Sequence, residues 1–465
     1  MMIKQGESMQ KSKTTGKADE FRKSTKVDKI DNNNKVDRID KARTAAVNVV
    51  YEVNVNNAYA NIALAKELRT NKLNDLDRRF ATELIYGTLK LGDSLDWIIS
   101  QYISRPLDKI DEKILAILRV GMYQIFFLDR VPNFAAINES VEMAKKINIG
   151  SSKFVNAVMR SAVREPDKSK FPDDDSVESV ALRLFHPKWL IERWFKQFGI
   201  DETKKICAAD NSEPPLTIRV NTLKTSKAEL ISELEKVGAE VVQSKLINEG
   251  LICKNLGALD NLSLLKNGLC QVQDESSMLV TQALNPQPGD CVIDACAAPG
   301  GKATHIAELM NNQGKIIACD IHEHKIKLIN DNARRLGINI INAKLLDARQ
   351  IGNKFADTAD KVLVDAPCSG LGVLRRKADL RWKKNFDELK ALPNLQFEIL
   401  SSAANAVKTG GTLVYSTCTL ECAENEEVIK KFLTANNNFE LIEQKTLLPQ
   451  IDGNDGFFIA VMNRK

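Results

Sequence analysis

The sequence has no long apolar run, and no stretch approaches the roughly 20 apolar residues that a membrane-spanning helix needs. It also lacks the apolar core of a secretory signal. We therefore expect a cytoplasmic protein with no membrane partner. The chain of 465 residues is too long for one hydrophobic core, which predicts several domains.

Cysteine pairs at metal-binding spacing are also missing. The nine cysteines include no CxxC pair and their number is odd, which argues against both a zinc site and a disulfide framework. We expect most of these thiols to be buried and inert, and we predict no metal. Cys418 and Cys422 are four residues apart, but two thiols alone make a poor metal site.

An excess of charge of either sign is absent beyond the first 43 residues. Those residues hold 12 Lys and Arg against 7 Asp and Glu, which accounts for the whole formal net charge of +5. Few apolar residues occur there, so we predict a disordered basic tail over residues 1–41. We interpret it as a solvated low-complexity arm, and an auxiliary arm that contacts RNA is the alternative.

Three different residue patterns follow the tail. Apolar residues recur at spacings of three and four throughout 42–164, for example in "DEKILAILRVGMYQIFFL", and predict an all-α domain. Pro and charged residues without an apolar face make 165–179 a predicted linker. Residues 180–285 mix helical patterns with the strand patterns "PPLTIRVNTL" and "AEVVQSKL", and predict a small α+β module.

Short apolar strands alternate with helices in the last part of the chain, as in "DCVIDA", "KIIACD", "NAKLL", "KVLVDA" and "GTLVYST". This alternation predicts an α/β domain over 286–465, with a parallel sheet, right-handed crossovers and a closing hairpin at the sheet edge. Ligands of such sheets bind beyond the carboxyl ends of the strands. Cys368 and Cys418 both fall at such ends.

The first strand of this domain leads into the loop "DACAAPGGKATH". Its small residues allow a backbone to approach a ligand closely before a helix begins. The loop matches neither GxGxxG nor the P-loop pattern, which disfavours a dinucleotide and a simple phosphate site. A nucleoside-like cofactor is indicated.

Aspartate ends four consecutive strands, at positions Asp294, Asp320, Asp347 and Asp365. Asp320 lies 20 residues after Gly300, a spacing at which an acid commonly binds ribose hydroxyls, and Asp347 is placed for an adenine amino group. A single strand-end Asp is often only a helix cap. Four of them around a Gly-rich loop suit a cationic sulfonium better than phosphates, so we predict S-adenosylmethionine and methyl transfer.

The strand-end thiols suggest which atom is methylated. Carbon 5 of cytosine becomes nucleophilic only after a nucleophile adds to carbon 6, and a thiolate does this well once the site lowers its pKa or removes its proton. A carboxylate must then stabilise charge at ring N3, and Asp365 is the candidate if it holds or shares a proton. The residues alone do not rank Cys368 against Cys418 as the nucleophile.

Together these motifs resemble the bacterial 16S ribosomal RNA cytosine-5 methyltransferases of the RsmB (Sun/Fmu) type. The resemblance spans roughly 40–465, and its most specific stretches are "VPNFAAINESVE", "RVNTLK", "VQDESS", "DAPCSGLGVLRRKADLRW" and "YSTCTLECAENE". It implies an N-terminal all-α RNA-binding domain like the antitermination factor NusB, a small α+β middle module, and a C-terminal Rossmann-like S-adenosylmethionine-dependent methyltransferase domain.

The resemblance also implies roles for single residues. Cys418 of the "STC" motif is the nucleophile, and Cys368 assists release of the methylated product. Cofactor contacts fall to Cys296, Ala297, Ala298, Pro299, Gly300, Gly301, Lys302, Asp320, Asp347 and Asp365. One departure is Ala303, which stands where Thr or Ser often follows the Lys and could loosen the first helical turn.

A basic segment follows the Cys368 loop and contains Arg375, Arg376, Lys377, Arg381 and Trp382. We interpret it as facing RNA, because the target base must leave its stack to meet the thiol and needs a basic or stacking surface nearby. A solvated basic loop is the alternative.

These inferences predict methylation of carbon 5 of a specific cytosine in 16S ribosomal RNA through a covalent Cys–cytosine adduct. We expect a monomer that acts on RNA that is unassembled or partly assembled into the small subunit. A transfer-RNA cytosine-5 methyltransferase has the same catalytic motifs and remains an alternative. A non-catalytic RNA-binding or antitermination factor is a second alternative, against which the intact Cys368, Cys418 and Asp365 count.

Overall fold

The computed structural model describes residues 40–465 with the exception of 72, 258, 260–261 and 385. The predicted basic tail therefore lies outside the described residues, apart from Asp40 and Lys41. Lys41 already starts a helix, because the Asp40 side chain caps it by accepting a hydrogen bond from the Arg43 amide. Asp40–Lys465 forms one compact unit.

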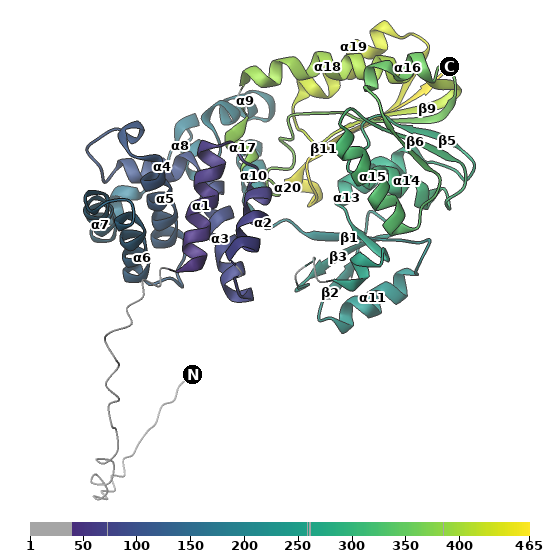
Figure 1. Cartoon of the computed structure of the whole chain (residues 1–465). Coiled ribbons are helices and arrows are strands. Elements are labelled where there is room, and N and C mark those ends of the chain that lie inside the picture. The colour runs from purple at the N-terminus through teal and green to yellow at the C-terminus, as the bar shows by residue number, and fades with distance from the viewer. Residues whose placement is uncertain (1–39, 72, 258, 260–261, 385) are drawn as a thin grey trace, which may run out of the picture. The chain divides into compact units, whose positions relative to one another are not determined.

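The first part of this unit is helical, as the apolar spacing predicted (Figure 1). Its helices are α1 (Lys41–Val55), α2 (Ala60–Asn71), α3 (Asp75–Leu91), α4 (Asp93–Ser100), α5 (Glu112–Phe127), α6 (Asn133–Lys145) and α7 (Ile149–Arg164). Helix α5 contacts α1, α3, α4, α6 and α7, and its buried Ile114, Ile117 and Leu118 form the centre of this domain.

The middle part combines three helices with a small antiparallel sheet. The helices are α8 (Val177–Arg183), α9 (Lys188–Phe198) and α10 (Ile200–Asn211). The sheet has the order β2-β3-β1-β4, with β1 (Leu216–Val220), β2 (Glu240–Gln243), β3 (Gly250–Lys254) and β4 (Cys270–Val272), accompanied by α11 (Lys227–Lys236) and α12 (Ser263–Lys266). Helix α8 begins inside the predicted linker, where the Ser176 side chain caps it.

A seven-stranded sheet with the order β10-β11-β9-β8-β5-β6-β7 organises the last part of the chain. Its strands are β5 (Cys291–Asp294), β6 (Lys315–Asp320), β7 (Ile341–Leu345), β8 (Ala359–Asp365), β9 (Val407–Thr417), β10 (Phe439–Leu447) and β11 (Phe457–Arg464). Strands β5 to β9 are parallel, and the β10–β11 hairpin adds antiparallel strands at the edge. This confirms the predicted Rossmann-like fold with its closing hairpin.

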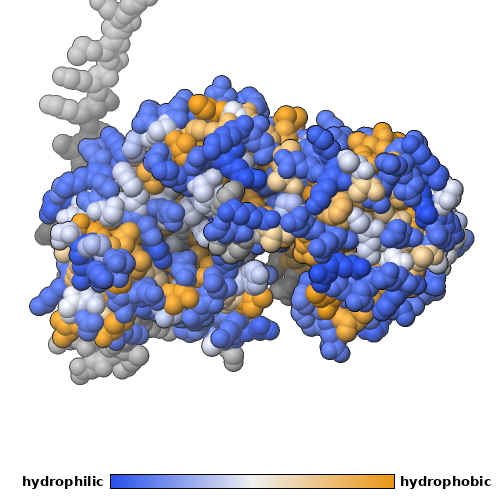
Figure 2. Space-filling view, turned by 90° about the horizontal axis from the view of Figure 1, so that it is seen from above, coloured by the Kyte–Doolittle hydropathy of each residue, from blue (hydrophilic) through white to orange (hydrophobic). Residues whose placement is uncertain are grey.

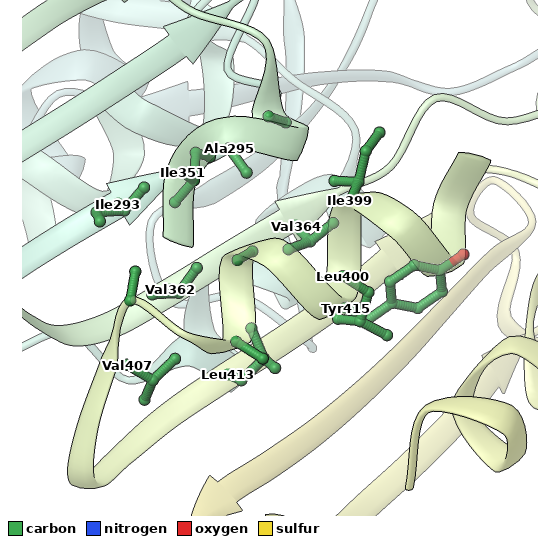
Figure 3. Packing of buried hydrophobic residues seen from close by; sticks show 14 of the residues in the cluster. Ile293, Ala295, Ile351, Val362, Val364, Ile399, Leu400, Val407, Leu413 and Tyr415 are labelled. Carbon is green, nitrogen blue, oxygen red and sulfur yellow. The ribbon is translucent and has the colours of Figure 1, made fainter. Parts of the chain in front are cut away.

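Helices cover both faces of the large sheet, because side chains of successive strand residues point to opposite faces. Val362 and Val364 face a cluster with α18 (Phe386–Ala404) and α16 (Ile351–Lys354), shown in Figure 3. Leu363, between them, packs instead with residues of α13 (Glu275–Leu284), α14 (Gly301–Leu309) and α15 (Glu323–Leu336). The remaining short helices are α17 (Leu380–Lys383), α19 (Glu426–Ala435) and α20 (Pro449–Asp452).

The outer surface is mainly hydrophilic on the face that Figure 2 shows, with separate hydrophobic patches. No helix in the described part of the chain has the length and apolar character needed to span a membrane.

Candidate active site

The two strand-end thiols lie together at one edge of the large sheet. Strands β8 and β9 are neighbours, and their last residues are held in register by the hydrogen bond from the Ala366 amide to the Ser416 carbonyl. The chain then leads from each strand to Cys368 or to Cys418, whose sulfur atoms are 3.3 Å apart. Both thiols line a cavity of about 950 Å³. The predicted placement at the carboxyl ends of the strands is therefore observed.

The surroundings of the two thiols differ in charge. The hydrogen bond that Cys418 accepts from the Cys368 thiol lowers the pKa of Cys418, although burial opposes the shift. The Asp365 carboxylate also raises the pKa of Cys418, whereas the nearby ammonium groups of Lys377 and Lys302 lower it. The same hydrogen bond, together with burial and the Glu424 carboxylate, raises the pKa of Cys368. Of the pair, Cys418 is therefore the thiol that loses its proton more readily.

Asp365 lies next to the thiols and bonds to a cation and a hydroxyl. The Lys302 ammonium donates to one carboxylate oxygen at 2.8 Å, and the Ser416 hydroxyl donates to the other at 2.9 Å. Burial would lower the pKa of Lys302, but the Asp365 carboxylate outweighs it and raises this pKa. The pair thus keeps a proton at the Lys302 amine, within reach of a ligand that contacts Asp365.

The glycine-rich loop gives the cavity its shape. Gly300 has φ = +104°, and a Cβ atom there would lie 3.2 Å from the Ile329 Cα in α15, so the turn requires glycine. The first turn of α14 is intact despite Ala303, because the Thr304 hydroxyl donates to the Gly300 carbonyl at 2.8 Å. The loop is therefore closely packed against α15.

The predicted cofactor residues fall into three groups. The cavity is lined by Cys296, Ala298, Asp320, Asp347 and Asp365. Lys302 reaches the site through Asp365, whereas the rest form the turn behind the wall, namely Ala297, Pro299, Gly300 and Gly301.

Two of the lining carboxylates already have partners. Asp320 is nearly buried, accepts a hydrogen bond from the His322 amide at 3.0 Å, and lies 3.8 Å from the Lys325 ammonium. Asp347 caps a short 3-10 turn and bonds through both oxygens to the Arg349 side chain. These contacts orient both carboxylates without closing the cavity. A ligand at Asp347 would share that carboxylate with a guanidinium.

Asp294 corrects one expectation, since it is not part of the acidic cleft. Its side chain is fully buried and does not line the cavity. Neither carboxylate oxygen has a hydrogen-bond partner among the described residues. Burial, with the nearby Asp365 charge, raises the pKa of Asp294 to about 7. The acidic rim therefore consists of three strand-end aspartates instead of four.

The interpretation of the basic segment as facing RNA is wrong for most of its residues. Arg375 and Arg376 bond to Asp455 at 2.6 and 2.5 Å, and Arg381 is fully buried and donates to the Phe185 carbonyl. These guanidinium groups connect the catalytic loop to other parts of the unit.

Trp382 likewise contacts the N-terminal domain, because its indole N–H donates to the Lys90 carbonyl of α3 at 3.3 Å. Lys377 is different: it is exposed and lines the cavity. Arg376 also lines the cavity, but its guanidinium is already paired with Asp455 and Asp274. Lys377 is thus the residue of the five that is both exposed and without such a carboxylate partner among the described residues.

Arg219 of "RVNTLK" supports the cofactor loop from the middle module. It is fully buried, forms a bidentate pair with Glu308 of α14 at 2.9 Å, and donates to the Gly301 carbonyl at 2.9 Å. The sequence had indicated this motif only through its resemblance to the family. Its position on a strand far from the loop in the sequence gave no sign of this contact.

The N-terminal domain also contributes to the cavity, which the sequence analysis missed. Tyr59, Asn61 and Ile62 at the start of α2, and Tyr86 of α3, line it. Nothing in the local pattern separates these residues from other helix-surface residues. Among the described residues, no group of His, Cys, Asp and Glu is placed to hold a metal ion.

Sequence comparison identifies the origin of this architecture. Residues 281–463 match the family described as 16S rRNA methyltransferase RsmB/F, residues 40–164 match the NusB family, and residues 186–259 match the RsmF/B-like ferredoxin-like domain. A Bacillus subtilis protein named "Probable ribosomal RNA small subunit methyltransferase B" is 40% identical, with 91% of this chain and 98% of that protein covered. The chain belongs to the RsmB/F family. The resemblance inferred from the motifs is thereby confirmed.

Other relatives and solved structures agree with this assignment. Ribosomal RNA small subunit methyltransferase B of Pseudomonas putida is 32% identical over 90% of this chain and 97% of its own length. The crystal structure of PH0851 has a TM-score of 0.79 at 29% identity, covering 91% of this chain and 98% of its own. The structure of NSun6 from Pyrococcus horikoshii with SFG has a TM-score of 0.56 at 27% identity, covering 60% and 98%.

Proposed function

We propose that this RNA methyltransferase transfers a methyl group to carbon 5 of a cytosine in 16S ribosomal RNA, with Cys418 as the nucleophile. The observation that carries the proposal is the pair of sulfur atoms 3.3 Å apart beside the Asp365–Lys302 ion pair. A methyltransferase that acted on an already nucleophilic nitrogen or oxygen would need neither thiol. Activation of an unreactive ring carbon needs one thiolate, and its release benefits from a second thiol.

The cavity suits S-adenosylmethionine, which supplies an electrophilic methyl group when bound. Asp320 is the acceptor for the ribose hydroxyls, Asp347 for the adenine amino group, and the small residues Cys296 and Ala298 leave room for the nucleoside. Family membership supports this assignment, as does the structural neighbour with SFG, an analogue of this cofactor.

The residues of the chain then act in order on a flipped cytosine. The Cys418 thiolate forms a bond to carbon 6, and the ring electrons move toward carbon 5 and N3. The Lys302–Asp365 pair holds a proton beside N3 and neutralises the charge that develops there. In the methylated adduct, loss of the carbon 5 proton to a base returns an electron pair to the ring. The carbon 6–sulfur bond breaks and its electron pair leaves on the Cys418 sulfur, which departs as a thiolate while the Cys368 thiol donates a hydrogen bond to it.

We propose in addition that the NusB-like residues 42–164 bind RNA, and that a monomer acts in the cytoplasm on RNA not yet fully assembled into the small subunit. The names of the relatives support 16S RNA over transfer RNA as substrate.

The two thiols make a direct test of the mechanism. Cys418→Ala should lower methylation of a 16S RNA transcript at least about a thousandfold while S-adenosylmethionine still binds, because the nucleophile is gone. Cys368→Ala should accumulate a covalent protein–RNA adduct that denaturing gels detect. Cys422→Ala is the matched control, since this half-buried thiol does not line the cavity, and it should leave activity unchanged.

Three results would contradict the proposal. An adduct in Cys418→Ala instead of Cys368→Ala would reverse the roles of the thiols. Bisulfite sequencing of the product that finds no 5-methylcytosine would exclude the chemistry. Faster methylation of transfer RNA than of the 16S transcript under the same conditions would show that transfer RNA is the preferred substrate.

A further inference from the structure

Residues of two domains line the cavity. Its volume of about 950 Å³ is at the upper end of the roughly 300–1,000 Å³ typical of a site for one small molecule. The cofactor residues Asp320 and Asp347 belong to the catalytic domain, whereas Tyr59 and Ile62 add a wall from the N-terminal domain. The cavity therefore has room for ligand atoms beyond the methyl donor.

Tyr59 and Ile62 present apolar surface to solvent in this wall. Each has 61% of its surface exposed although both line the cavity. Tyr59 immediately precedes α2, and Ile62 lies in its first turn, where the Ile62 amide donates to the Tyr59 carbonyl at 3.0 Å. An exposed aromatic ring beside an exposed aliphatic side chain offers a surface on which a planar base stacks.

The catalytic domain fixes this surface in place. Asp379 accepts a hydrogen bond from the Ala60 amide at 3.2 Å and thereby caps α2. Lys383 donates to the Ala58 carbonyl at 2.5 Å, and its ammonium lies 4.7 Å from the centre of the Tyr59 ring. The ring is thus held by a cation–π contact while most of its surface remains accessible.

Positive charge accompanies the apolar surface. Lys377, two residues before Asp379, lines the cavity, and its ammonium has no hydrogen-bond or ion-pair partner within residues 40–465 as far as the structure describes them. It is close enough to Cys418 to lower the pKa of that thiol. A phosphate next to the reacting base would meet this charge.

We propose that Tyr59 and Ile62 form a stacking platform for the nucleotide that adjoins the target cytosine, with Lys377 at the intervening phosphate. This inference rests on the proposed function. A base that has been flipped toward Cys418 remains attached to the RNA chain on both sides. The adjoining nucleotide must therefore lie along the wall of the cavity. The N-terminal domain would then set RNA affinity from within the active site as well as from its outer surface.

The test is steady-state and single-turnover methylation of an in vitro 16S RNA transcript. Tyr59→Ala should raise the KM for RNA roughly tenfold, since one base–aromatic stack is lost, and should leave the single-turnover rate at saturating RNA within about twofold. Ile62→Ala should raise the KM less. Tyr59→Phe, which keeps the ring, should stay within about twofold of wild type. The Kd for S-adenosylmethionine should not change in any of them.

Phe134→Ala is the matched control, because this α6 residue is 69% exposed in the same domain but does not line the cavity. An equal KM for Tyr59→Ala and Phe134→Ala would overturn the proposal. So would a Tyr59→Ala protein that loses cofactor affinity and RNA affinity together, since that pattern indicates a disturbed fold.

A second measurement does not depend on how the variants fold. Ultraviolet irradiation of the wild-type complex with the transcript should give a nucleotide adduct on the peptide that contains Tyr59, and an adduct on the Phe134 peptide alone would overturn the platform. Failure of the proposed function is distinguishable, because wild-type protein would then make no 5-methylcytosine. If the wild-type protein makes 5-methylcytosine and Tyr59→Ala has an unchanged KM for RNA, the stacking platform is contradicted and the proposed function stands.

Discussion

Cys418 and Cys368 carry the same functional group, yet their surroundings move the pKa values of the two thiols in opposite directions. A lowered pKa leaves the Cys418 thiolate populated at a lower pH than an ordinary cysteine. Iodoacetamide should therefore alkylate Cys418 with a pH midpoint below that of a free thiol. Cys368→Ala removes the hydrogen-bond donor and should raise this midpoint by about one pH unit.

Peptide mapping by mass spectrometry measures the pH midpoint of alkylation for each cysteine, and Cys422 is an internal reference. Burial and nearby glutamates raise the pKa of Cys422 to about 11, so this thiol should stay unmodified over the same pH range. An unchanged Cys418 midpoint in Cys368→Ala would mean that the cations alone set its pKa.

For single residues, the sequence predicted where the two thiols lie but not which of them is the nucleophile. Both thiols were predicted at strand ends, because strand patterns and parallel order are readable from the chain. Their ranking came only through the resemblance. It depends on Lys377, Lys302 and Glu424, which the fold brings to the sulfurs from three separate segments.

Among the elements, the sequence predicted the strands of the large sheet but only some strands of the small sheet. Strands β5, β6 and β8 are apolar runs that are buried over most of their length, which is the pattern that parallel sheets impose. Strand β7, at the edge of the sheet, is largely exposed. The patterns for β1 and β2 were recognised, whereas β3 and β4 were not. Strand β4 spans only three residues, too few to show an alternation of apolar and polar residues.

Helix α2 depends on a cap that is remote in the sequence. Since Asp379 accepts from the Ala60 amide, Asp379→Ala should cost about 1 kcal/mol locally and speed amide hydrogen exchange in the first turn of α2. Because Tyr59 immediately precedes that turn, the KM for RNA should rise as well. Asp111→Ala removes a cap of α5 and should speed exchange there while leaving the KM for RNA unchanged.

Exchange measured by mass spectrometry separates the two helices. Unchanged protection of α2 in Asp379→Ala would show that the hydrogen bond across the domains contributes nothing to the helix.

For the whole molecule, the domain types were predictable but the surfaces that meet were not. Arg381 and Trp382 looked like an RNA-binding segment because charge and aromatic content are the usual signs of one. In the fold they contact Phe185, Asn211 and Lys90, which lie 170 or more residues away in the sequence. A local pattern cannot indicate which distant segment will cover a residue.

The contact between the N-terminal domain and Trp382 supports a last prediction. Gly92, between α3 and α4, has φ = +42°, and a Cβ atom there would lie 2.1 Å from Cε2 of the Trp382 indole. Gly92→Ala must therefore displace the ring next to Lys383, which orients Tyr59. Gly199→Ala is the matched control, because its φ of +79° brings similar backbone strain with no atom within 4 Å of the new methyl group.

Both substitutions should lower the unfolding midpoint in calorimetry because both place alanine at a positive φ. Gly92→Ala should lose about 1–3 kcal/mol more through overpacking, and its KM for RNA should rise while the Kd for S-adenosylmethionine stays constant. Equal losses in the two variants would show that the indole moves aside freely. The position of the N-terminal domain would then not depend on this contact, and RNA affinity should be insensitive to residue 92.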